Sequence, residues 1–253
     1  VQAVDSPPLA VASILCKKLA EGLDRLVLDV KCGSGSFTPD PAAAHAMAET
    51  MVQVATGYGV RCRALVTDMS QPLGRTVGNA LEVVESIETL QGGGPDDLRD
   101  LVVALAGDPR AADVLASGAA FETFEEMVAA QGGDAAALRD PGQLRGGGTT
   151  DHVLTADRAG HLATLDALSV GIAAFKLGAG RREAGAAIDF GVGITLHAKV
   201  GDAVAAGQPL LTLHHRDGHG LDDALERLSG QVVLSDAPVA APTLIHEVVE
   251  APA

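Results

Sequence analysis

Two short apolar segments, joined by a glycine-rich turn and a helix, constrain the fold of this chain most strongly. Residues 25–31 (RLVLDVK) and 61–68 (RCRALVTD) are apolar runs rich in Leu, Val and Ala, which is typical of buried strands. Between them lie Gly33-Ser34-Gly35-Ser36 and a helical segment that begins at Pro41 and ends near Gly59. This order of strand, turn, helix and strand predicts two parallel strands of an α/β fold.

The pattern changes in the second half of the chain. Residues 131–150 contain two glycine clusters and no regular periodicity, which indicates a loop. After this loop, short apolar segments alternate with turns. We therefore expect an incomplete parallel-sheet α/β domain with helices over residues 1–149, followed by a smaller C-terminal α+β domain over residues 150–253.

Composition excludes several classes of protein. The chain has 253 residues, 18 Lys and Arg against 33 Asp and Glu, a formal net charge of −15 and only 2% aromatic residues. It lacks the basic surface and the stacking platform of nucleic-acid binding proteins. It also lacks an apolar run of about 18 residues, so we expect no membrane span. Three cysteines, an odd number, are typical of a reduced cytoplasmic protein.

Three local patterns could carry chemistry. Ser13 and Lys17 stand four residues apart in a predicted helix, so they project from one face, where spacing alone favours a polar stripe. Residues 29–37 are a strand end that runs into a small-residue loop, which could admit an anion or a substrate, or serve only as a connection. The histidines at positions 214, 215 and 219 have no Cys or carboxylate to complete a metal site, and we expect them to be surface residues.

The segment VGDAVAAGQPLL (residues 200–211) resembles the hairpin of biotinyl and lipoyl carrier domains. The resemblance implies a barrel-sandwich-like C-terminal domain. The lysine that carrier domains modify is missing, since TLHHR follows the hairpin. A non-catalytic carrier or binding module stays open as an alternative function, with the absent lysine against it.

Longer segments resemble the pyrimidine nucleoside phosphorylase and thymidine phosphorylase family. They are ASILCKKLAEGLDRLVLDVKCGSGSF, SQPLGRTVGNALEV and KLGAGRREAGAAIDFGVGITLHAKVGDAV, in the family's order. The resemblance implies reversible phosphorolysis of pyrimidine nucleosides (thymidine, uridine or deoxyuridine) to the free base and (deoxy)ribose 1-phosphate. The implied enzyme is a pentosyltransferase, a cytoplasmic homodimer that acts on a nucleoside and inorganic phosphate. A related phosphoribosyltransferase is the alternative enzyme.

The resemblance also assigns site residues. Ser13 and Lys17 match the family's base-binding positions, with Lys17 as the catalytic group, and Phe37 matches a residue that lines the pocket. No cofactor is required, but some members bind a potassium-type cation through backbone carbonyls and one Glu. The matching positions are Leu73, Thr76 and Glu85, and relatives more often have Ala at the position of Thr76.

Some family motifs are missing from these 253 residues. The KHSTGG-type phosphate loop and the GGTLDKLE block do not occur in them, and the family's base-binding Arg and upstream His have no match either. The chain thus contains half of a base pocket and no phosphate site. We expect it to be inactive by itself and the parent protein to be active.

Overall fold

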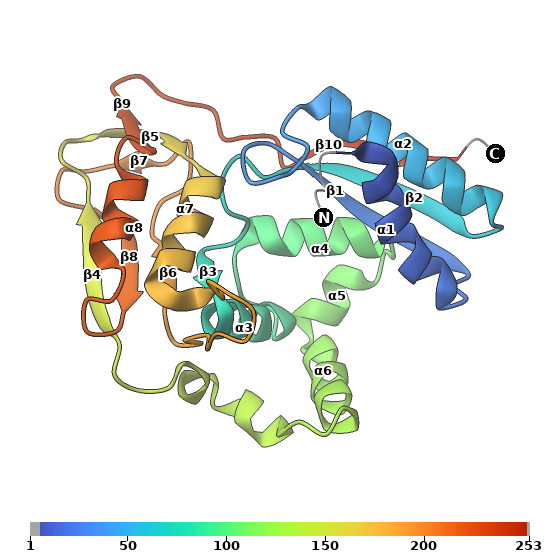
Figure 1. Cartoon of the computed structure of the whole chain (residues 1–253), viewed down its shortest axis with the longest axis horizontal. Helices are drawn as coiled ribbons and strands as arrows, with labels where there is room; N and C mark the ends of the chain where they lie inside the picture. The colour runs from blue at the N-terminus through green and yellow to red at the C-terminus, as the bar shows by residue number, and fades with distance from the viewer. Residues whose placement is uncertain (1–5, 252–253) are drawn as a thin grey trace. The chain divides into compact units, whose positions relative to one another are not determined.

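The computed structural model of the chain describes residues 6–251 (Figure 1). These residues form two compact units. The first contains residues 6–70, 104–106 and 242–251, and the second contains residues 71–103 and 107–241. Both units draw on segments from either side of residue 149, so the sequence-based domain boundary stays a prediction.

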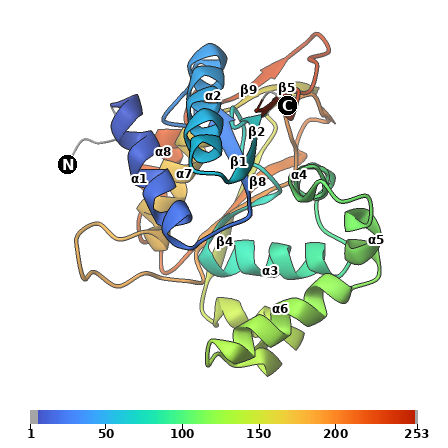
Figure 2. The same cartoon turned by 90° about the vertical axis from the view of Figure 1, so that its right-hand side faces the viewer.

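The first unit is a small sheet covered by helices. Strand β1 (Arg25–Cys32) runs parallel to β2 (Arg61–Asp68), which confirms the α/β prediction. Helix α2 (Pro41–Gly57) packs on these strands, and α1 (Pro7–Ala20) lies beside α2 (Figure 2). Strand β10 (Ile245–Glu250) pairs with β2 in antiparallel orientation. A strand from the end of the chain therefore extends a sheet that the sequence assigns to the N-terminal half alone.

The start of α2 follows directly from its sequence. The Asp40 carboxylate accepts the N–H groups of Ala42 and Ala43, each at 3.3 Å, and Pro41 occupies the first turn. A capping Asp satisfies donors that have no partner inside the helix, and Pro lacks a donor there. The capped start of α2 therefore fixes the end of the glycine-rich loop that follows β1.

The second unit contains two antiparallel sheets, with the strand orders β3-β6-β8-β4 and β7-β5-β9. The strands of the first sheet are β3 (Thr76–Gly78), β4 (Thr150–Thr155), β6 (Gly193–Leu196) and β8 (Pro209–His215). Those of the second are β5 (Gly160–Leu165), β7 (Ala203–Val204) and β9 (Val232–Ser235). The predicted α+β character of this part of the chain is confirmed.

Helices of the second unit form two groups. Helices α7 (Ala167–Ala174) and α8 (Leu221–Leu228) lie side by side and share a core with the sheets (Figure 1). Helices α3 (Asn79–Leu90) and α6 (Ala119–Ala130) enclose a smaller apolar cluster (Figure 2). The other helices are α4 (Asp96–Ala106), α5 (Ala111–Ala116), η2 (Ala135–Arg139), η3 (Pro141–Arg145) and η4 (Phe175–Ala179). None of the helices within residues 6–251 is long and apolar enough to cross a membrane.

Candidate functional site

Helix α1 presents Ser13 and Lys17 on its outer side. Ala10, Val11 and Leu15 bury the inner side of this helix, whereas Ser13 and Lys17 are exposed. Their four-residue spacing places the hydroxyl and the ammonium on one face. Within residues 6–251 neither side chain forms a hydrogen bond or an ion pair, so both groups can bind a ligand. These two residues are called the α1 pair below.

Phe37 lies in the loop that follows β1, and 56% of its surface is exposed. The hydroxyls of Ser36 and Thr38 both donate to the carbonyl oxygen of Lys31, at 2.7 and 2.8 Å, and so fix the loop on either side of Phe37. Among the described residues, no hydrogen bond joins Phe37 to the α1 pair. The role of Phe37 in a base pocket therefore stays a prediction.

At the start of the candidate segment 29–37, Asp29 and Lys31 form a polar cluster with Thr67 that the sequence alone does not predict. The ammonium of Lys31 lies 2.7 Å from the carboxylate of Asp29 and donates to the hydroxyl of Thr67 at 3.0 Å. Alternation along β1 places Asp29 and Lys31 on one face, and the parallel register brings Thr67 opposite Lys31. The spacing of two residues between Asp29 and Lys31 is the sequence signal that could have predicted this cluster. The cluster lies at the strand end where parallel sheets bind ligands.

The structure places Glu85 against the segment that contains the other predicted cation residues, Leu73 and Thr76. The carboxylate of Glu85, on α3, accepts the N–H of Arg75 at 2.8 Å, and only 7% of Glu85 is exposed. Burial raises the pKa of this carboxyl, and the charges of Asp97 and Glu82 add to the effect. The Arg75 N–H and the Thr76 hydroxyl oppose it. Among the described residues Glu85 has no ion-pair partner, so a bound cation would stabilise its charged form.

The carbonyl of Thr76 is not used in the pairing between β3 and β6. Thr76 pairs with Thr195 on β6, and the N–H of Leu196 donates to the carbonyl of Arg75 at 2.7 Å. Because hydrogen-bonded and non-bonded positions alternate in an antiparallel pair, the Thr76 carbonyl points away from β6. β3 is an edge strand of its sheet, so this carbonyl is not used by another strand.

The Glu85 carboxylate and the backbone carbonyls are ligands that fit an oxygen-preferring cation such as potassium. Hard cations prefer carboxylate and carbonyl oxygens, and a single buried Glu beside backbone carbonyls provides both. No group of three or more His, Cys, Asp or Glu side chains that could hold a metal ion occurs within residues 6–251. Any cation at this site would therefore depend on the carbonyls of Leu73 and Thr76 as well as on Glu85.

The prediction of surface histidines is wrong for two of the three positions. His214 and His215 are only 5% and 7% exposed, because β8 is buried on both faces. His214 lies 2.8 Å from the Thr195 hydroxyl and 2.6 Å from the Asp151 carboxylate. Burial lowers the pKa of His214, and the hydrogen bond that its ring donates to the Asp151 carboxylate opposes this shift. His214 therefore links Thr195 on β6 to Asp151 on β4 across the sheet, and the Nδ1 of His215 accepts the N–H of Gly218 at 3.0 Å.

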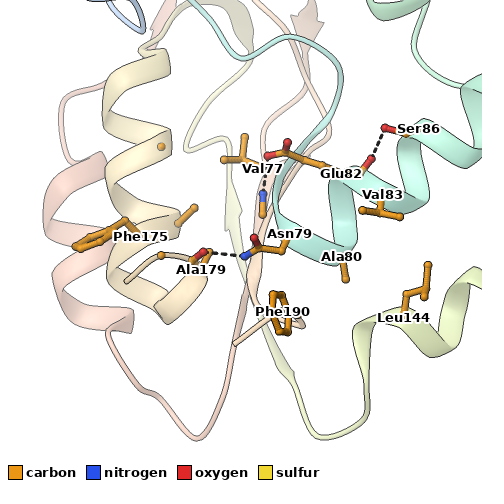
Figure 3. Close-up of a pocket in the computed structure, with 14 residues that line it drawn as sticks. Val77, Asn79, Ala80, Glu82, Val83, Ser86, Leu144, Phe175, Ala179 and Phe190 are labelled. Carbon is orange, nitrogen blue, oxygen red and sulfur yellow. Dashed lines mark hydrogen bonds between the residues drawn. The ribbon is translucent and has the colours of Figure 1, made fainter. Parts of the chain in front are cut away.

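An open pocket of about 800 Å³ also lies in the second unit (Figure 3). Figure 3 shows Val83, Leu144 and Phe190 around it, and the side-chain amide of Asn79 donating to the Ala179 carbonyl at 2.7 Å. None of the predicted site residues lines this pocket. The lining of the pocket therefore does not include the predicted cation residues of the same unit.

Comparisons with known proteins match both halves of the chain. A family model described as "Glycosyl transferase family, a/b domain" matches residues 3–130, and "Pyrimidine nucleoside phosphorylase C-terminal domain" matches residues 161–235. A thymidine phosphorylase of Mycobacterium tuberculosis is 44% identical over 246 residues, which are 93% of this chain and 56% of that protein. Pyrimidine-nucleoside phosphorylases of Geobacillus stearothermophilus and Staphylococcus aureus are 40% and 38% identical over 261 residues.

The two matches to the latter proteins cover 96% and 97% of this chain, and 59% and 60% of the relatives. The chain therefore spans a little over half the length of the curated relatives that it matches. The family resemblance predicted from the sequence is confirmed: this chain belongs to the pyrimidine nucleoside phosphorylase and thymidine phosphorylase family.

Proposed function

We propose that the protein to which this chain belongs catalyses reversible phosphorolysis of pyrimidine nucleosides. One observation supports this most directly: the α1 pair is exposed and unengaged in the part of the chain that matches the glycosyl transferase domain. In this reaction the bond between the sugar C1′ and the base N1 breaks, and a phosphate oxygen forms a new bond to C1′. The products are the free base and a pentose 1-phosphate.

The α1 pair would act on the departing base. As the C1′–N1 bond breaks, negative charge develops on the pyrimidine ring and its oxygens. An ammonium and a hydroxyl held on one helix face can stabilise this charge where it develops, and helix α1 fixes both groups before the reaction begins. In this proposal Lys17 provides the charge and Ser13 a directional hydrogen bond, and Phe37 lines the pocket.

The proposed enzyme binds potassium through the carbonyls of Leu73 and Thr76 and through Glu85, and it requires no other cofactor. When bound, the cation supplies positive charge beside a buried carboxylate. The protein is proposed to be a cytoplasmic homodimer, as the family resemblance implies. Its substrates are a pyrimidine nucleoside and inorganic phosphate, and the net charge of −15 argues against nucleic acid as a partner.

The decisive experiment compares two lysine variants in the product of the complete gene. Phosphorolysis of thymidine and of uridine is followed by the ultraviolet change as the base is released. Lys17→Ala should lower kcat/KM by about 100- to 1000-fold, because it removes a group that stabilises charge in the transition state. Lys18→Ala is the matched control, because Lys18 is also exposed on α1 but faces another direction.

Unchanged circular dichroism would show that both variants fold. If neither nucleoside reacts with the wild-type protein, the proposed activity is wrong. If Lys17→Ala and Lys18→Ala retain equal activity, the proposed role of the α1 pair is wrong although the activity stands.

A further inference from the structure

Lys199 forms an unusual set of contacts in the second unit. Its ammonium donates to the carbonyl oxygens of Pro72 and Gly74, the latter at 2.8 Å, and pairs with the carboxylate of Asp97 at 2.9 Å. Only 12% of the Lys199 side chain is exposed. A largely buried lysine with three oxygen partners loses much of its side-chain freedom, so its contacts must offset this loss of entropy.

Two of these partners, Pro72 and Gly74, belong to one short segment, residues 71–76. This segment is called the cation loop below because it contains the proposed ligands Leu73 and Thr76. The residue after Lys199 adds a further contact, since the N–H of Val200 donates to the side chain of Gln71 at 2.9 Å. At the other end of the loop, the carbonyl of Arg75 accepts the N–H of Leu196. Residues 196–200 therefore hold the cation loop along its whole length.

These contacts also orient the proposed ligands. The N–H of Gly74 donates to the same Asp97 carboxylate that Lys199 binds, at 3.2 Å. This N–H shares a planar trans peptide with the carbonyl of Leu73, so that carbonyl points away from Asp97. In the same way, the Arg75 N–H that binds Glu85 shares its peptide with the Gly74 carbonyl, which points to Lys199. The ammonium of Lys199 thus binds the carbonyls of Pro72 and Gly74, on either side of the peptide that carries the Leu73 carbonyl.

Charge balance supports the same role. Asp97 and Glu85 accept the N–H groups of two neighbouring residues, Gly74 and Arg75, so both carboxylates face the same loop. Lys199 neutralises Asp97 directly, so the charge that remains for a bound cation is that of Glu85. Without Lys199, the carboxylates of Asp97 and Glu85 would compete for the cation. The carbonyls of Pro72 and Gly74 would also lose the donor that they share.

We propose that Lys199 is a positioning residue, a built-in cation that holds the peptides around Leu73 in the cation loop, and with them the Leu73 carbonyl, in place for potassium. This inference rests on the proposed cation site. Lys199 does not itself contact the bound ion in this arrangement. It lies in the segment that matches the C-terminal domain of the family, so that domain would tune a site built mainly on residues 71–85.

The test measures potassium binding by the chain itself, without an activity assay. The thermal unfolding midpoint is followed as KCl replaces tetramethylammonium chloride at constant ionic strength, because a cation that binds only the folded state raises this midpoint. In Lys199→Met, the potassium concentration that gives half of the effect should rise about tenfold or more, within the usual range of coupling between neighbouring sites. Asp97→Asn should shift it in the same direction, and it provides a second variant if Lys199→Met does not fold.

Lys176→Met is the matched control. It removes another lysine of the second unit, whose side chain is 40% exposed and 3.7 Å from Asp223, without touching the cation loop. Its potassium response should equal that of the wild type. Hydrogen exchange of the Gly74 and Arg75 amides, measured without potassium, gives a second readout. Exchange should be faster in Lys199→Met and unchanged in Lys176→Met.

The outcomes separate the two proposals. If the wild type shows no stabilisation by potassium, the cation site is wrong, and the role of Lys199 is overturned with it. If the wild type responds and Lys199→Met responds equally or at lower potassium, the cation site stands and the role of Lys199 alone is overturned. Unchanged amide exchange in Lys199→Met would also overturn that role.

Discussion

At the scale of single residues, Gly74 is the most tightly determined position of the cation loop. It has a φ of +68°, and a Cβ at this position would lie 2.1 Å from a carboxylate oxygen of Glu85. A side chain would therefore strain the backbone and displace the buried carboxylate at the same time. Glycine is required here by the close approach of α3 to the loop, and the proposed cation site depends on that approach.

Gly74→Ala should destabilise the chain by about 1–3 kcal/mol, the usual cost of a strained backbone position. Gly171→Ala is the control, because Gly171 lies exposed in helix α7 with open space around its Cα. Alanine favours a helix interior over glycine, so the control should stabilise the chain by up to about 1 kcal/mol. Urea unfolding followed by circular dichroism measures both values. Equal effects of the two substitutions would contradict the strain argument.

At the scale of elements, β10 shows how a distant strand contributes to the first unit. It pairs with β2 along the side opposite β1, with Val249 opposite Ala64 and Val248 opposite Leu65. Val249 is 9% exposed and faces the core, whereas Val248 is 49% exposed. The two neighbouring valines have the same size and strand propensity. Substitutions at these two positions therefore distinguish the effect of burial from the effect of strand propensity.

Val249→Asp should lower the free energy of unfolding by about 2 kcal/mol or more, because it places a carboxylate in an apolar core. Val248→Asp keeps the charge change and the strand position but leaves the new carboxylate in water, so its effect should be much smaller. Urea unfolding again measures the difference. A similar loss in both variants would mean that β10 contributes no buried face to this sheet.

At the scale of the whole molecule, the chain spans 56% to 60% of the length of its relatives. The family's phosphate-binding motifs do not occur in its 253 residues. A nucleophile without a binding site must react from solution, and the advantage of a fixed orientation is lost. The α1 pair by itself would then stabilise a leaving base that nothing displaces.

The chain alone should therefore show no phosphorolysis of thymidine or uridine above the uncatalysed rate, whereas the product of the complete gene should be active. Release of the base, measured by its ultraviolet change at saturating phosphate, compares the two proteins directly. Intact folding of the short chain is checked by its far-ultraviolet circular dichroism. Activity of the folded short chain would show that its own residues bind phosphate.

Several features of this protein are determined by its sequence alone. The apolar runs of β1 and β2 and the glycine-rich loop between β1 and α2 predict parallel strands, and α2 begins at the predicted Pro41. The family is also predicted from the sequence, because its motifs are long and occur in order along the chain. These signals are local: each depends on residues within one element or one loop, where spacing and backbone preferences act directly.

Other features depend on residues far apart in the sequence, and only the tertiary structure decided them. The segment ALSVGIAA is apolar on nearly all sides and contains Gly, so no periodicity marks it as helix α7 before burial supplies a reason. From the sequence, His214 and His215 are expected to be polar surface residues, but the tertiary structure buries both faces of β8. Lys199 meets Asp97 and the cation loop from more than 100 residues away. Periodicity reports which face of an element is buried, whereas chain folding alone selects the partner that buries it.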